Sequence, residues 1–352
     1  MRGILMILGI VIHSAQIFSP EAVLKIVNPD TSILMKYLVD SIHLFRMPAF
    51  FVVSGFFCFM TLQKHGIKIF LKIRLIRIAI PLIACIFTLN IAMHYWTVAT
   101  GWSEQTLESF FTSGRYINHL WFLVDLIYFF LITSIIHYFL DAKSALKKLF
   151  SLTLFKSIPL SSVLILLPFY TIFIMALNKI GIPIYVQKFG LFSPYSILYN
   201  YAFFIFGYFL YANRDLYRSF ISINPLLNIA IIAGSLIIFN SLKSSQISIY
   251  LVIAEYSYLL AQWCSVALCF YLFSKFMSKE RKIVLNLSEA SYTIYLFHFL
   301  ILIVISDFFI KSRFNIMTSF FLINIIVLLI TTYIHFNLIK KSDILRYLFN
   351  GK

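Results

Sequence analysis

The chain of 352 residues contains 61% hydrophobic and only 12% charged residues, and its mean hydropathy is +0.92. A soluble domain is about 45–50% apolar and about 25% charged, so this chain has too few polar side chains to cover a water-facing surface. The composition therefore excludes a soluble protein of two ordinary domains and indicates a polytopic membrane protein. Phe is abundant, with 39 copies, and Gly is scarce, with 11, which favours lipid-facing helices over the alternating strands of a barrel.

Ten apolar stretches are long enough, or nearly so, to cross a bilayer as helices, which takes about 20 residues. In chain order they lie at residues 3–19, 42–63, 78–97, 119–140, 158–178, 195–212, 225–240, 251–274, 289–309 and 317–338. Four prolines punctuate the fifth stretch and the segment that follows it, namely Pro159, Pro168, Pro183 and Pro194. A kink or a re-entrant segment is therefore an alternative to simple crossings there. We expect an all-α transmembrane helix bundle of about ten spans.

The formal net charge of +16 would suggest a nucleic-acid partner in a soluble chain. In a membrane protein, Lys and Arg gather instead in the cytoplasmic loops. If Arg2 lies in the cytoplasm, 20 of the 29 Lys and Arg fall in inner segments and 8 fall in outer loops, while Arg46 lies within a span. The charge pattern thus predicts that both termini are cytoplasmic and that nucleic acid is not a partner.

The four cysteines lie inside apolar stretches, and no Cys/His cluster has the spacing of a zinc finger. They are Cys58, Cys85, Cys264 and Cys269. We expect inert core thiols, with no disulfide framework, no metal site and no permanently bound cofactor.

Ionisable side chains inside membrane spans are costly and mark candidate functional sites. In this chain they are His13, His43, Arg46, His94, His119, Asp125, His137, Glu255, Glu289, His298, Asp307 and His335.

His13 lies well inside the membrane when its depth is measured from Arg2 at the membrane surface. A helix rises 1.5 Å per residue, which places His13 roughly 16 Å from Arg2 and close to mid-bilayer. His298 lies roughly 13 Å from Glu289, on the same side, so the two imidazoles are expected to share one cavity. Eleven residues make about three full helical turns, so Arg2 and His13 share one face that an extended ligand could follow. The alternative is an interfacial anchor Arg and an unrelated, hydrogen-bonded core His.

Arg74 and Arg77 form a second basic feature at the inner surface. Their i, i+3 spacing projects both guanidinium groups from one helical face. Paired guanidinium groups suit bidentate contacts with phosphate. The alternative is a topology signal whose side chains reach towards lipid headgroups.

Arg46 follows His43 by about one helical turn and lies inside the second stretch, on its outer side. An unpaired Arg there would be costly, so we expect a carboxylate partner from the outer third of the bundle. Asp125, Glu255 and Asp307 are the candidates. The alternative is an ion pair that only fixes helix packing.

Ser54 and Gly55 interrupt a Phe-rich run, and close helix approach is favoured there over a nucleophilic serine, which would need a base. Aromatic residues such as Trp121, Tyr292 and Tyr295 more often belong to an interfacial belt or a core than to a ligand site.

Five segments together resemble acyltransferase family 3, a family of integral membrane acyltransferases. They are Arg2–His13, His43–Phe56, Arg74–Arg77, His119–Leu123 and Ser291–His298. The first resembles the Arg, ten residues, His signature of the family's first helix, the third its Arg-x-x-Arg pair, and the last its Tyr-Leu-x-His helix. The similarity runs in order through nearly the whole chain, so we expect one domain over 1–352. The opening hundred residues resemble the branch that modifies periplasmic glucans with succinyl groups.

The resemblance implies a multi-pass enzyme of the bacterial cytoplasmic (inner) membrane, surrounded by membrane lipid. Such an enzyme moves an acyl group from a cytoplasmic donor, acetyl-CoA or succinyl-CoA, to a hydroxyl group of a carbohydrate outside. His13 and Arg2 are the implied catalytic residues, with His13 as general base or acyl acceptor. Arg74 and Arg77, together with Arg2, would attract the CoA phosphates. This mechanism requires a crevice that joins the three arginines to His13. The residues implied to support the acceptor side are His43, Arg46, Trp121, Asp125, Tyr295 and His298.

A secondary transporter or glycan exporter is the alternative function. Such folds show two related halves with interrupted helices. No internal repeat is visible here, and only the proline-rich region after residue 158 favours the alternative.

Overall fold

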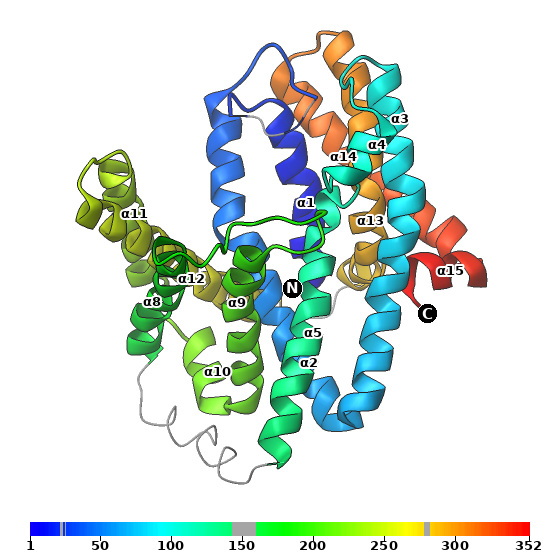
Figure 1. Ribbon diagram of the computed structural model, residues 1–352. Helices are drawn as coiled ribbons and strands as arrows, with labels where there is room; N and C mark the ends of the chain where they lie inside the picture. Colours follow the sequence, from blue (N-terminus) through cyan, green and yellow to red (C-terminus); the bar gives the residue numbers. More distant parts are fainter. Residues whose placement is uncertain (22–23, 25, 143–159, 278–281) are drawn as a thin grey trace.

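The computed structural model describes residues 1–21, 24, 26–142, 160–277 and 282–352 (Figure 1). Within these ranges the chain is helical between its turns and loops and contains no β-strand. The prediction of an all-α fold is therefore confirmed. Pro159 and the basic residues of 143–157 and 279–281, which entered the charge analysis, lie outside the described residues.

Each of the ten predicted stretches overlaps a described helix, although the first runs two residues beyond the end of its helix at Ile17. The longer helices are α1 (Arg2–Ile17), α2 (Ile33–Cys85), α5 (Trp121–Ala142), α8 (Leu160–Lys179), α9 (Pro194–Ala212), α11 (Pro225–Leu242), α12 (Ser248–Phe276), α13 (Lys282–Lys311) and α14 (Ile316–Ile334). Shorter helical elements are η1 (Ile86–Asn90), α3 (Ile91–Ala99), α4 (Leu107–Thr112), η2 (Asn118–Leu120), α10 (Arg214–Ile221), η3 (His335–Ile339) and α15 (Asp343–Asn350).

Seven described helical stretches are long and apolar enough to cross a membrane, which makes this a multi-pass membrane protein. They are Ile33–Ala99, Asn118–Phe139, Leu160–Lys179, Pro225–Leu242, Ser248–Phe276, Val284–Lys311 and Ile316–Ile339. The first contains two of the predicted stretches, because the chain turns back at Gly66, whose φ of 71° breaks the helix (Figure 1). Helix α1 has only 16 residues, and neither it nor α9 is among the seven.

Helices α2 and α9 pack with their backbones in direct contact. A Cβ atom on Gly55 would lie 1.8 Å from the carbonyl oxygen of Phe204, and one on Gly207 would lie 1.9 Å from that of Val52. The expected close approach at Gly55 is confirmed, and Gly207 is its counterpart on α9.

Replacing Gly207 by alanine is expected to force α2 and α9 apart and to lower the thermal stability of the detergent-solubilised protein. Overpacking typically costs about 1–3 kcal/mol, and a backbone neighbour cannot rotate away as a side chain can. The melting temperature of purified protein measures the effect. Gly234→Ala on α11 is the matched control, because its new Cβ would meet no atom within 4 Å. Equal stability of the two variants would contradict this packing.

Of three apolar clusters among the described residues, two are large. One is built largely from α2, α5, α9 and α12, and the other from α1, α13 and α14. The short helix α15 then folds back against the second half of α2, and a Cβ on Gly351 would lie 2.5 Å from the Cα of Arg77 (Figure 1). This contact brings the C-terminal residues beside one of the predicted phosphate-binding arginines.

Candidate active site

Three imidazole rings from three different elements meet inside the bundle. The ring centroids of His13 on α1 and His298 on α13 lie 5.5 Å apart, and those of His119 on η2 and His298 lie 5.4 Å apart. The Phe299 ring contacts His13 at 5.0 Å and His119 at 4.8 Å. The predicted proximity of His13 and His298 is confirmed, and we call His13, His119 and His298 the histidine cluster.

Gln16, one turn after His13, orients the His13 ring. His13 Nδ1 lies 2.9 Å from Gln16 Oε1, and Gln16 Nε2 lies 3.4 Å from His43 Nε2. An amide oxygen only accepts hydrogen bonds, so the neutral tautomer that satisfies this contact carries its proton on Nδ1 and leaves a lone pair on Nε2. Sequence reasoning missed Gln16 because it is not ionisable, although its i, i+3 spacing to His13 predicts contact.

Tyr295 links the other two histidines. Its hydroxyl group donates a short hydrogen bond to the backbone carbonyl of His119. His298 Nδ1 donates to the carbonyl oxygen of Tyr295 at 2.6 Å. His298 Nε2 is buried and has no hydrogen-bond partner among the described residues. It is therefore an unused acceptor at the centre of the bundle.

Arg46 lies beside the histidine cluster, and the prediction of a carboxylate partner for it is wrong. It is 6% exposed, its Nε donates to the Leu5 carbonyl oxygen at 3.2 Å, and it forms no ion pair with any described residue. Leu5 precedes His13 on α1, so the guanidinium group lies between the levels of Arg2 and His13 rather than in the outer third.

The expected acidic partners point elsewhere, because helix rotation turns them towards other neighbours. Asp125 on α5 accepts from Ser196 at 2.8 Å and Asn200 at 3.1 Å. Asp307 on α13 accepts from Trp102 at 2.6 Å and pairs with Lys311 at 2.8 Å. Asp125 therefore belongs to the α5–α9 contact and not to the histidine cluster.

Two other predicted residues lie beside the cluster rather than in it. Trp121 is 37% exposed, and its ring lies 6.3 Å from that of Phe51. His43 reaches the cluster through Gln16 and also lines a large groove of about 910 Å³ between α2, α11 and α12.

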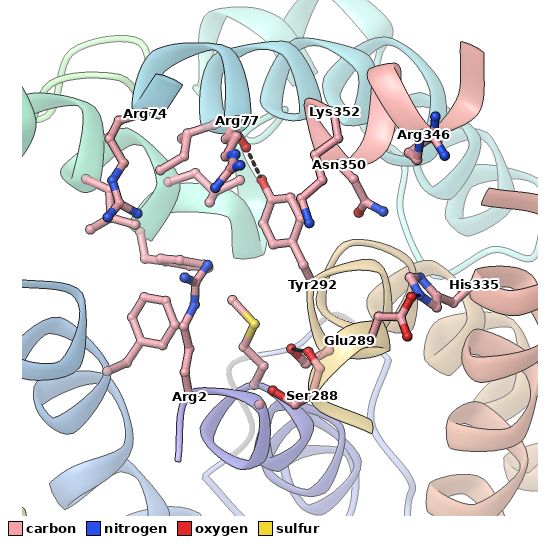
Figure 2. A pocket seen from close by; sticks show the side chains of 18 of the residues that line it. Arg2, Arg74, Arg77, Ser288, Glu289, Tyr292, His335, Arg346, Asn350 and Lys352 are labelled. Carbon is pink, nitrogen blue, oxygen red and sulfur yellow. Dashed lines mark hydrogen bonds and ion pairs between the residues drawn. The ribbon is translucent and has the colours of Figure 1, made fainter. Parts of the chain in front are cut away.

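A cavity of about 330 Å³ opens at the end of the bundle where Arg2, Arg74 and Arg77 converge (Figure 2). Six of its lining residues are cations and one, Glu289, is an acid. The cations are Arg2, Arg74, Arg77, Lys340, Arg346 and Lys352. We call this the inner cavity, and its excess of positive charge favours anions.

Neighbouring groups hold the arginines of the inner cavity in place. Arg74 donates to the Phe57 carbonyl oxygen at 2.8 Å and to the Thr61 hydroxyl at 2.6 Å, across the turn at Gly66. The Tyr292 hydroxyl donates to the Arg77 carbonyl oxygen at 3.1 Å (Figure 2).

The inner cavity ends before it reaches the histidine cluster. Met6, Phe50 and Phe122 line it, whereas His13, His119 and His298 do not. The expected open crevice from the arginines to His13 is therefore not present as one cavity in this conformation. Arg2 and Met6 do lie on the same helical face as His13, as the spacing predicts.

A second cavity, of about 270 Å³, lies on the other side of the cluster, and we call it the outer cavity. Phe299, which touches His13 and His119, is one of its walls. Gln105, Arg115 and Asn118 add polar groups, and the His94 and Phe110 rings stack at 4.6 Å within it. The histidine cluster is thus flanked by a cationic cavity and a polar, aromatic one.

Comparison with known proteins gives one family and a set of partial relatives. The family model described as an acyltransferase domain, of the acyltransferase 3 type, matches residues 1–336. Glucans biosynthesis protein C from Escherichia coli strains K12, O6:K15:H31 (536) and O1:K1 is 31% identical over 133 residues. The match spans 36% of this chain and only 34% of the length of those relatives. No solved structure matches.

Proposed function

Since this chain belongs to acyltransferase family 3, we propose that it moves an acetyl or succinyl group from cytoplasmic acyl-CoA to a glycan hydroxyl outside the membrane. The family makes the protein an acyltransferase and removes the transporter alternative. The donor, the acceptor, the catalytic histidine and the bacterial inner membrane as location are our proposals. The observation that supports them best is the position of His13 on the same helical face as a cavity lined by six cations.

We propose ten spans with both termini in the cytoplasm. The residues that the charge pattern assigns to the inner side come from the N-terminus, the second half of α2 and the C-terminal segment, and they line one cavity. Gln105, Arg115 and Asn118, from a loop assigned to the outer side, line the other. This separation supports the orientation.

The inner cavity is the proposed site for the CoA phosphates. CoA carries several phosphate charges, and guanidinium groups bind phosphate with directed, charge-assisted hydrogen bonds. The pantetheine arm then extends along α1 past Met6 towards His13. Because Met side chains change shape easily, we propose that Met6 moves aside when the thioester enters.

The outer cavity is the proposed entrance for the acceptor. Its polar side chains can donate to sugar hydroxyl groups, while the aromatic rings of Phe110 and Phe299 offer flat apolar surfaces. The name of the matched relatives, glucans biosynthesis protein C, supports a glucan as the acceptor.

His13 is the proposed general base. Its Nε2 lone pair takes the proton of the acceptor hydroxyl as the oxygen attacks the thioester carbonyl carbon. Gln16 keeps the Nδ1 proton in place, so that the basic nitrogen is Nε2. An imidazole suits this task because its ordinary pKa lies near working pH.

A transfer assay with purified protein tests the proposal. With carbonyl-labelled acetyl-CoA or succinyl-CoA and a glucan oligosaccharide, we expect labelled, alkali-labile ester on the glucan and free CoA in equal amount. Gly234→Ala, which disturbs no contact, serves as the active control variant. If neither donor yields labelled glucan or free CoA, the proposed reaction is wrong.

A further inference from the structure

Arg46 is a buried cation without an anion. Its only hydrogen bond among the described residues is the one from Nε to the Leu5 carbonyl oxygen, at 3.2 Å, and no carboxylate pairs with it. An unpaired guanidinium group in a membrane span is costly, and such groups mark functional sites. Its terminal nitrogens therefore have donor capacity that the protein itself does not use.

Gly9 allows Arg46 and His298 to converge on α1. A Cβ atom on Gly9 would lie 3.1 Å from Arg46 Nη2 and 3.4 Å from His298 Nε2. Two groups from α2 and α13 thus approach the same point on the α1 surface, where any larger residue would intrude. His298 in turn stacks on His13, with ring centroids 5.5 Å apart.

The position of Arg46 separates it from the phosphate site. Arg46 does not line the inner cavity, whereas Met6, Phe50 and Phe122 do. Its contacts on α1, Leu5 and Gly9, lie between Arg2 and His13. A donor whose phosphates occupy the inner cavity would present its thioester, rather than a phosphate, at this level.

We propose that Arg46 is a catalytic residue that binds the thioester carbonyl oxygen and stabilises the negative charge that develops on it. This inference rests on the proposed acyl transfer and assigns a second role within it. Preorganised donors aimed at a developing oxyanion, in a site without water, give large rate effects.

The proposed transfer passes through a tetrahedral intermediate. The acceptor oxygen bonds to the carbonyl carbon while its proton passes to His13 Nε2, and the carbonyl π electrons move to the oxygen facing Arg46. The tetrahedral intermediate then re-forms the carbonyl group, the carbon–sulfur bond breaks, and the CoA sulfur leaves with the proton returned by His13. Arg46 keeps its charge and its protons throughout.

The test is the kinetics of Arg46→Gln and Arg46→Lys with acetyl-CoA as donor. Arg46→Gln is expected to lower kcat by about 10²- to 10³-fold, the range found when one oxyanion donor is removed, with the KM for acetyl-CoA changed less than about threefold. Lysine keeps the positive charge but lacks the planar guanidinium group. Arg46→Lys is therefore expected to retain more activity than Arg46→Gln.

The Gly9→Ala variant tests the same role of Arg46 if the Arg46→Gln variant does not fold. The added methyl group must displace the guanidinium group by a few tenths of an ångström, and we expect kcat to fall about tenfold at an unchanged KM. Normal kcat in Arg46→Gln, or in Gly9→Ala where Arg46→Gln does not fold, would overturn the inference. So would a loss confined to succinyl-CoA, which would make Arg46 a site for the distal carboxylate instead. If the wild-type protein transfers no acyl group at all, the proposed function fails rather than the role of Arg46.

Discussion

His13→Ala is expected to lower acyl transfer to the background of the assay while the amount of folded protein stays unchanged. General-base catalysis contributes about 10²- to 10⁴-fold. His298 Nε2 is also unpaired, but His298 lies on α13, whereas His13 lies on the same face of α1 as Arg2 and Met6, which line the inner cavity. The rate of labelled glucan formation, relative to the quantity of monodisperse protein, measures the effect.

His65→Ala is the matched control for this variant. His65 is exposed beside the turn at Gly66, so the same chemical change is made far from the cluster, and full activity is expected. Substantial transfer by His13→Ala would remove His13 from the chemistry, whatever the protein's family.

The double substitution Arg74→Ala and Arg77→Ala is expected to raise the KM for acyl-CoA about 10- to 100-fold. Hydrogen bonds to charged groups contribute about 1.5–3 kcal/mol each, and partial exposure of these arginines reduces that contribution. The kcat at saturating donor is expected to change little, because neither side chain reaches the histidine cluster. Initial rates over a range of acyl-CoA concentrations separate the two constants.

Lys72→Ala controls for charge alone. Lys72 lies on the same turn of α2 as the two arginines, is exposed, and does not line the inner cavity. The Lys72→Ala variant therefore loses one inner positive charge while the inner cavity stays unchanged, so its KM for acyl-CoA is expected to stay normal. An unchanged KM for acyl-CoA in the double variant as well would mean that Arg74 and Arg77 set the membrane orientation and do not bind the donor.

Positions along single helices could be predicted well from the sequence. The rise and rotation of an α-helix are fixed, so eleven residues suffice to place Arg2 and His13 on one face. The depth of His298 followed from the same rise, and the structure brings it next to His13. The close approach at Gly55 could be predicted because a residue without a side chain is needed where two backbones touch.

Relations between helices could not be predicted, because the rotation of one helix against another depends on the whole packing. Depth alone predicts an acidic partner for Arg46, whereas its hydrogen bond goes to the backbone of α1. Gln16 and Gly9 cannot be identified from the sequence because they carry no charge. Lys352 lies in a segment predicted only as a basic inner tail, since the apolar face of a short helix does not by itself indicate which other helix it docks against.

Reconstituted vesicles with the protein in a single orientation test the central claim most directly. Labelled acyl-CoA, which cannot cross the bilayer, is supplied only on the side of Arg2, and unlabelled glucan is enclosed on the opposite side. We predict that the enclosed glucan gains label with wild-type protein and gains none with His13→Ala. Enclosed glucan that stays unlabelled with wild-type protein, although CoA is released outside, would contradict transfer through the bundle.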